Sequence, residues 1–244
     1  MKLKIFEDYN ELSRMTAQAA AGYIQNNPNS LVCFAAGDTP LGMLRELVAM
    51  QSRGEVDLAS VYYAGLDEWV GLGRDDTGSC ENVMYNAFYE PAGIPKERIR
   101  LFNGLAADLE AECRMMEDWI RSHRGIGFTV LGIGMNGHIG FNEPGAPDHD
   151  GCFVTELDAT TKSVSKKYFG MERPVSAGIT IGWRTLFKAG RAIIMVSGGN
   201  KAEVVKAAYE GPITIDMPAS LFQKHENVCL MLDKEAASGL SKAQ

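Results

Sequence analysis

Acidic residues and a histidine are grouped in two short stretches of the chain. Asp67 and Glu68 stand side by side after the apolar run 61–66, and His138 and Glu143 are five residues apart in a loop bounded by glycine and proline. A carboxylate can abstract a carbon-bound proton as a general base. A carboxylate that pairs with histidine raises the basicity of the ring and fixes its tautomer, so that the histidine can pass a proton to an oxygen atom. These stretches are candidates for proton transfer.

Both stretches also have a purely structural interpretation. Two acids directly after a strand could begin a helix, where the helix dipole favours negative charge. His138 could be an ordinary loop histidine whose ring nitrogens are satisfied by neighbours. His149 and His225 have no comparable context, and we expect them to be structural.

Two strand-to-helix turns could hold an anion. Gly37-Asp38-Thr39-Pro40 precedes a helical pattern, and free backbone N–H groups at a helix start favour phosphate. The alternative is a plain Asp cap, and the Asp38 carboxylate would itself repel an anion. Lys201 follows a glycine-rich run and could pair with phosphate. It could equally be a solvated surface charge.

A polar, lysine-rich segment at 163–173 lacks apolar periodicity, and we expect it to be a lid. Lys166 and Lys167 on this lid could close over the same anion. The run Gly132-Ile133-Gly134-Met135-Asn136-Gly137 meets the spacing of a dinucleotide fingerprint, but this match is weak alone because it lies mid-chain and no regular helix pattern follows. We therefore do not expect a dinucleotide.

The elements that must position these residues alternate along the chain. Apolar runs predict strands at 31–36, 61–66, 128–134, 192–196 and 227–232, and helical periodicity predicts helices at 13–25, 39–51, 106–123 and from 202 to about 210. This alternation predicts one Rossmann-like α/β domain over 1–244, with a mostly parallel sheet covered by helices on both faces. In such sheets ligands bind beyond the carboxyl ends of the strands, where all the candidate residues fall.

Composition narrows the class of function. The chain has 244 residues and a net charge of -7, which argues against a nucleic-acid surface. Its five cysteines show no CxxC pair and its four histidines have no ligand spacing, so we expect reduced thiols and no metal site. No signal peptide and no apolar run of about 18 residues occurs, which predicts a cytoplasmic protein without a membrane partner. A homo-oligomer is compatible with the sequence, as is a monomer.

Taken together, the motifs resemble the glucosamine-6-phosphate deaminase family, which shares its fold with 6-phosphogluconolactonases. The resemblance covers nearly the whole chain and is carried by GDTPLG at 37–42, LDEWVGL at 66–72 and GHIGFNEP at 137–144. The last run is specific for the deaminase side. It implies deamination and isomerisation of an amino-sugar 6-phosphate without metal or organic cofactor.

The resemblance also implies roles for individual residues. Asp67 looks like the base that moves a proton between C2 and C1, while His138, with Glu143 as its partner, looks like the group that assists ring opening. The implied catalytic residues are Asp67, His138, Glu143, Asn136 and Glu68, and the implied substrate- and phosphate-binding residues are Ala36, Gly37, Asp38, Thr39, Gly137, Lys167 and Lys201.

Three positions depart from the family pattern. Asn136 stands where some members have Asp, Asp38 where most have a small residue, and Lys167 where some have a phosphate-binding Arg. Lysine keeps the charge of arginine but lacks its bidentate fork. Trp69 and the stretch 78–81 resemble a branch associated with galactosamine 6-phosphate. The competing hypotheses are a lactone hydrolase and a catalytically silent sugar-phosphate binder.

Overall fold

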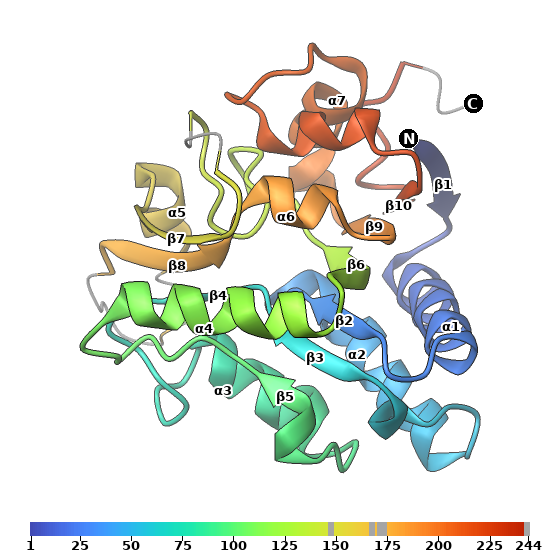
Figure 1. Cartoon of the computed structure of the whole chain (residues 1–244). Coiled ribbons are helices and arrows are strands. Elements are labelled where there is room, and N and C mark those ends of the chain that lie inside the picture. Colours follow the sequence, from blue (N-terminus) through green and yellow to red (C-terminus); the bar gives the residue numbers. More distant parts are fainter. Residues whose placement is uncertain (146–148, 166–168, 170–174, 242–244) are drawn as a thin grey trace.

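A computed structural model describes residues 1–145, 149–165, 169 and 175–241 of the chain. Its main feature is a parallel sheet whose order in the described residues is β1-β10-β9-β6-β2-β3-β5 (Figure 1). The strands are β1 (Lys2–Phe6), β2 (Leu31–Phe34), β3 (Tyr62–Gly65), β5 (Ile99–Arg100), β6 (Ile126–Leu131), β9 (Arg191–Val196) and β10 (Val228–Asp233).

Helices cover both faces of this sheet, as the sequence predicts. The described α-helices of the chain are α1 (Tyr9–Asn26), α2 (Asp38–Ser52), α3 (Cys80–Met84), α4 (Leu109–Ser122), α5 (Ala159–Ser165), α6 (Trp183–Phe187) and α7 (Ala202–Glu210). Neighbouring residues of β2 enter opposite cores: Val32 packs in a cluster with α1 and α2, and Cys33 in a cluster with α4, α6 and α7. The alternating direction of strand side chains therefore gives the sheet two apolar faces.

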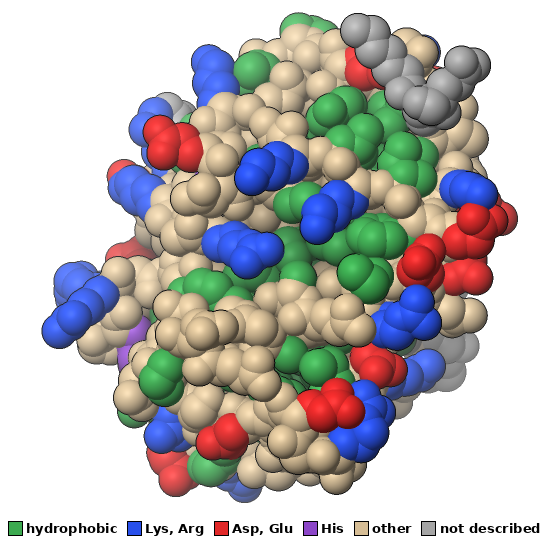
Figure 2. All heavy atoms as spheres, turned by 90° about the vertical axis from the view of Figure 1, so that its right-hand side faces the viewer, with side chains coloured by type: hydrophobic (Ala, Val, Ile, Leu, Met, Phe, Trp, Pro, Cys, Tyr) green, Lys and Arg blue, Asp and Glu red, His purple; other side chains and the backbone are tan. Residues whose placement is uncertain are grey.

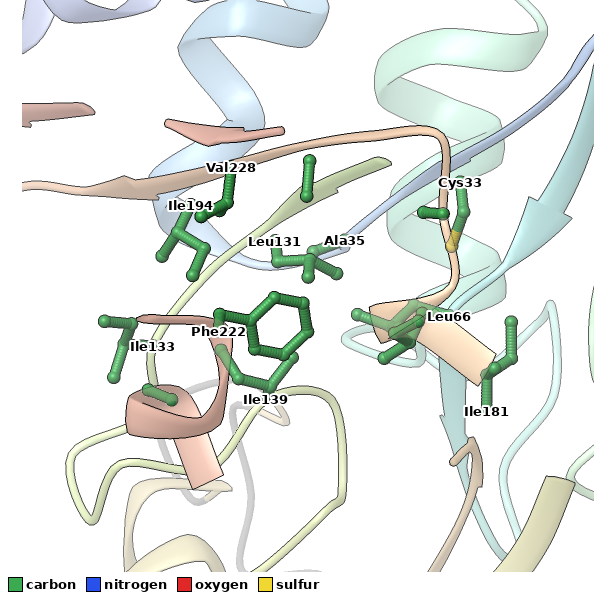
Figure 3. Close-up of a cluster of buried hydrophobic side chains, with 14 of the residues drawn as sticks. Cys33, Ala35, Leu66, Leu131, Ile133, Ile139, Ile181, Ile194, Phe222 and Val228 are labelled. Atoms are coloured by element: carbon green, nitrogen blue, oxygen red, sulfur yellow. The ribbon is translucent and has the colours of Figure 1, made fainter. Parts of the chain in front are cut away.

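The second of these clusters reaches into the loop after β6. Leu131, Ile194 and Val228 come from three adjacent strands, and Ile133 and Ile139 from the loop pack with them (Figure 3). Ile133 and Ile139 are buried. The loop that carries His138 is thus anchored on both sides of the histidine by core residues.

A second, antiparallel sheet was not predicted. It has the order β4-β8-β7 and consists of β4 (Asp67–Trp69), β7 (Cys152–Glu156) and β8 (Ala177–Ile181). Asp67 and Glu68 therefore lie in a strand, and their interpretation as the start of a helix is wrong. The backbone N–H of Ile181 donates to the carbonyl of Leu66, which draws the chain from β3 into the second sheet. Three residues are too few for a strand pattern to be seen in the sequence.

Several boundaries differ from the prediction. Helix α4 begins at Leu109 because the Asp108 side chain accepts the N–H of Ala111 and caps it. Strand β1 was missed because it is a half-exposed edge strand with Lys2 and Lys4 outward. Charged side chains suit a free edge, since they oppose pairing with another strand. In Figure 2, which shows the molecule from the side of β1, basic and acidic side chains lie interspersed with apolar ones.

Only part of the predicted lid can be compared with the structure. Residues 163–165 form the last turn of α5, and Lys166 and Lys167 lie outside the described residues. Short helical turns complete the described chain at Leu58–Ser60, Tyr85–Tyr89, Lys96–Arg98, Gly199–Lys201 and Pro218–Lys224. None of the described helices is both long enough and apolar enough to cross a bilayer.

Candidate active site

A cavity of about 940 Å³ opens beyond the carboxyl ends of β2, β3, β6 and β9. Segments that follow all four strands line it, as expected for ligand sites in parallel sheets. The predicted site residues that line the cavity are Ala36, Gly37, Asp38, Thr39, Asp67, His138 and Lys201. The described predicted residues that do not line it are Glu68, Asn136, Gly137 and Glu143.

Asp67 stands at the start of β4 and faces the cavity. Burial raises the pKa of its carboxyl group to about 6, while the charge of His138 and a hydrogen bond from the Cys80 thiol act in the opposite direction. A carboxylate with a pKa near neutrality is suited to take up and return a proton. The position at the junction of the two sheets thus gives Asp67 both its access to the cavity and its proton affinity.

His138 and Glu143 are in contact, as their spacing predicts. His138 Nδ1 lies 3.2 Å from Glu143 Oε2. Burial works to raise the pKa of Glu143, but hydrogen bonds from His138, Thr161 and Asn136 outweigh it and lower the pKa. An ionised carboxylate only accepts hydrogen bonds, so Nδ1 carries a proton and Nε2 is the nitrogen left to exchange one.

Helix α5 contributes to this relay, and the sequence analysis missed that contribution. Thr161 Oγ1 lies 3.1 Å from His138 Nδ1, and the Asp158 backbone N–H donates to Glu143 Oε1 at 3.3 Å. Thr161 is buried. Its distance of 23 residues from His138 left no local signal. Helix α5 therefore holds the histidine and its carboxylate partner in one orientation.

Asn136 connects two carboxylates. Its Nδ2 group donates to Glu143 Oε2 at 2.8 Å and to Asp158 Oδ1 at 3.3 Å. An Asp at this position would be a third acid without an N–H to donate, whereas the amide joins the two acids. The departure from Asp therefore fits the surroundings that this chain provides.

Gly134 and Gly137, the second and third glycines of the 132–137 run, have steric reasons. A Cβ atom at Gly134 would lie 2.2 Å from His138 Nε2, so the imidazole ring occupies the space above this glycine. Gly137 has a φ of +89°, and a Cβ there would lie 2.2 Å from Met217 Sδ. The second and third glycines of the GxGxxG spacing thus make room for a histidine and a methionine, whereas a Cβ at Gly132 would have no described neighbour within 4 Å.

Glu68 is a buried anchor beneath the cavity. Its Oε1 accepts the backbone N–H of Trp69 at 2.8 Å and of Cys80 at 2.9 Å, and its Oε2 accepts that of Glu81 at 2.7 Å. Burial raises the pKa of Glu68 to about 7 against the effect of these three donors. The side chain fastens the start of α3 to β4, next to Asp67.

The turn at 37–40 presents the start of α2 to the cavity. Gly37 has a φ of +114°, and no side chain caps the helix, so the positive end of the α2 dipole faces the cavity, where it favours an anion. The hydroxyl group of Tyr9 lies 3.1 Å and 3.0 Å from the carbonyl oxygens of Asp38 and Thr39, and it accepts the N–H of Gly42. Tyr9 fixes this turn and was missed by the sequence analysis.

Among the described residues, one lysine and one arginine line the cavity. Lys201 Nζ donates to the carbonyl of Ile133 at 2.7 Å, which holds it between the loops after β6 and β9. Arg45, on α2, is exposed at the rim and was not predicted. Arg45 lies two turns into α2, where the sequence is an ordinary helical pattern, so no motif marked it as a candidate site residue. Within the described residues, no group of three or more His, Cys, Asp or Glu side chains could hold a metal ion.

Comparison with known proteins agrees with this geometry. The family of glucosamine-6-phosphate isomerases/6-phosphogluconolactonase matches residues 7–231. The chain belongs to this family. A glucosamine-6-phosphate deaminase from Thermoanaerobacter sp. (strain X514) is 38% identical over 239 residues, covering 98% of this chain and 94% of the relative.

Solved structures extend the comparison. A monomeric glucosamine-6-phosphate deaminase is 34% identical with a TM-score of 0.94, over 98% of this chain and 100% of the other. A 6-phosphogluconolactonase from Leishmania guyanensis has a TM-score of 0.78 over 98% of each chain at 18% identity, which shows a shared fold alone. The predicted α/β fold and family are confirmed.

Proposed function

We propose that this protein is an enzyme that converts an amino-sugar 6-phosphate and water into the ketose 6-phosphate and ammonia. The observation that carries the proposal is that Asp67 and His138 face one cavity from different strand ends. The relatives of the chain that are named glucosamine-6-phosphate deaminases support the same reaction. A phosphate group would bind at the start of α2, with Lys201 as its cation.

The reaction needs two kinds of proton transfer. Ring opening requires the O1 hydroxyl to lose a proton and the ring oxygen O5 to gain one, and His138 Nε2 is suited to carry it. Asp67 then takes the proton from C2 and returns it to C1, while O1 gains a proton and the amine nitrogen loses one, which leaves a hydroxyl group at C1 and an imine at C2. Water adds to this imine and ammonia leaves, so that the ketose 6-phosphate remains.

The substrate proposed first is glucosamine 6-phosphate, because it appears in the names of the relatives. Its 4-epimer, galactosamine 6-phosphate, is the second substrate to test, since Trp69 and residues 78–81 resemble the branch associated with it. The two sugars differ only at the 4-hydroxyl.

The test is ammonia release from both amino sugars by the wild type and by Asp67→Asn. We expect turnover of at least one substrate and a loss of roughly 10²-fold or more in kcat for the variant. Hydrolysis of 6-phosphogluconolactone is measured in parallel. Equal turnover by the variant would remove Asp67 from its proposed role, and lactone hydrolysis without ammonia release would overturn the proposed reaction.

A further inference from the structure

Cys80 is the first residue of α3, and it lies half-buried in the wall of the cavity beside Asp67. Its Sγ atom lies 3.6 Å from Asp67 Oδ1, within hydrogen-bond distance for sulfur. Among the described residues, this is the only hydrogen bond that the Asp67 side chain makes. Rotation of the carboxylate is therefore restrained by this one contact.

The thiol is itself held firmly by the backbone. The N–H groups of Cys80 and Glu81 both donate to the buried carboxylate of Glu68. The preceding residue, Ser79, is buried, donates to the carbonyl of Gly73 at 2.7 Å and caps α3. A side chain on such a rigid turn can hold a neighbouring group in a fixed orientation.

The surroundings of the thiol also determine its protonation. Burial raises the pKa of Cys80 well above its ordinary value, and the nearby Glu68 and Asp67 carboxyl groups raise it further. A thiol that keeps its proton is a weak nucleophile but can still donate a hydrogen bond. Cys80 is therefore suited to donate to Asp67 and unsuited to attack a substrate.

We propose that Cys80 is a positioning residue for the reaction, whose thiol holds Oδ1 of Asp67 and leaves Oδ2 to face C2 and C1 of the substrate. This inference rests on the proposed function, in which Asp67 is the base. It explains how one carboxylate can exchange a proton with both C2 and C1. Oδ1 is fixed by the thiol, so Oδ2 is held in one orientation toward both carbons. Small errors in the orientation of a reacting group cost large factors in rate.

The first test compares Cys80→Ala with Cys80→Ser, which are similar in size but differ in the donor. Besides Cys80, the described titratable groups around Asp67 are Glu68, His138 and Cys33. All remain in both variants. A hydrogen bond to an ionised carboxylate favours the charged form, so its loss raises the pKa of the base. We expect the acid limb of kcat/KM to move to higher pH in Cys80→Ala and not in Cys80→Ser.

The same variants separate positioning from substrate binding. We expect kcat of Cys80→Ala to fall about tenfold with KM nearly unchanged, and Cys80→Ser to recover most of the loss. Cys229→Ser, at the other half-buried thiol, serves as the control and should behave like the wild type. An acid limb and a kcat that are the same in the wild type and both Cys80 variants would overturn the proposal.

A second test needs no substrate. Iodoacetamide labelling of Cys80 is measured in a Cys229→Ser background, with and without Asp67→Asn, and Cys80→Ala identifies the labelled site. Removing the negative charge favours the thiolate, so labelling should be severalfold faster in Asp67→Asn. An unchanged labelling rate would contradict the contact on which the proposal depends. If labelling becomes faster in Asp67→Asn as expected but the wild type releases no ammonia, the contact stands and the proposed function is refuted.

Discussion

Glu143 is the hydrogen-bond acceptor of His138 in the proposed proton relay. Burial works against its ionised form, yet donors on His138, Asn136 and Thr161 lower its pKa. In Glu143→Gln the neutral amide can neither fix the Nδ1 tautomer in the same way nor stabilise a protonated ring. We expect kcat/KM for ammonia release to fall by roughly 10²-fold or more. Thr161→Val, which removes one hydroxyl group, should cost about tenfold. Activity of Glu143→Gln within a factor of two of the wild type would contradict the relay.

The pH dependence follows from Asp67. Burial raises the pKa of this carboxyl group to about 6, above its value in the unfolded chain. A general base must be ionised, so kcat/KM should fall as the pH drops through about 6. A profile of kcat/KM between pH 5 and 8 measures this, given that an ordinary aspartate has a pKa near 3.9. A kcat/KM that stays constant down to pH 5 would contradict the assignment of this ionisation to Asp67.

At the residue scale, sequence spacing was informative only for neighbours. The separation of five positions from His138 to Glu143 predicted their contact, which the structure confirms at 3.2 Å. Thr161 and Tyr9 act on residues 23 and about 30 positions away, respectively, so that no local pattern could reveal them. Residues that orient a site from distant elements are visible only after the chain has folded.

At the element scale, the loop after β6 contains a matched pair of glycines. A Cβ at Gly134 would collide with the His138 ring, whereas a Cβ at Gly132 has no described neighbour within 4 Å. We expect Gly134→Ala to displace the imidazole and lower kcat by roughly 10²-fold. Gly132→Ala should stay close to the wild type. Ammonia assays on both variants test this, with near-UV circular dichroism to verify folding. Equal activity in the two variants would contradict the position assigned to the ring.

The junction between β4 and α3 should be a stability element. Glu68 is buried and accepts three backbone N–H groups, so Glu68→Ala would leave these donors without their partner. We expect a loss of about 1–3 kcal/mol in the free energy of unfolding. Glu90→Gln, in the exposed Arg74–Glu90 ion pair, should cost no more than about 1 kcal/mol. Urea unfolding measures both. A smaller loss for Glu68→Ala than for Glu90→Gln would contradict the anchoring role.

The predictability of the elements depended on their burial and length. Strands β2, β6, β9 and β10 were predicted within a few residues because they are apolar on both faces. The sheet β4-β8-β7 was missed, although it supplies Asp67. Its pairing joins residues 67–69 to residues 178–180, and long-range antiparallel pairing of this kind leaves no period in a single sequence.

At the scale of the whole molecule, the alternation of strands and helices predicted a parallel sheet with its site at the carboxyl ends. The order of the strands could not be predicted, because the two apolar faces of each strand fit several neighbours equally well. The net charge of -7 offers no general attraction for a sugar phosphate. We therefore expect local groups to hold the anion, so that its binding is sensitive to the loss of a single lysine.

The increase in Tm caused by a bound ligand tests whether Lys201 and the start of α2 bind the phosphate. A ligand that binds only the folded chain stabilises it by about 2.7 kcal/mol at 100 times its Kd. For a chain of this size we expect fructose 6-phosphate, the ketose 6-phosphate that glucosamine 6-phosphate would yield, to raise Tm by roughly 5–10 °C at that concentration. Lys201→Gln removes the cation that Ile133 holds in the cavity and should reduce the shift at the same ligand concentration to below about 2 °C. Lys188→Gln, in an exposed ion pair with Asp150, should retain the full shift. A full shift in Lys201→Gln would place the phosphate elsewhere.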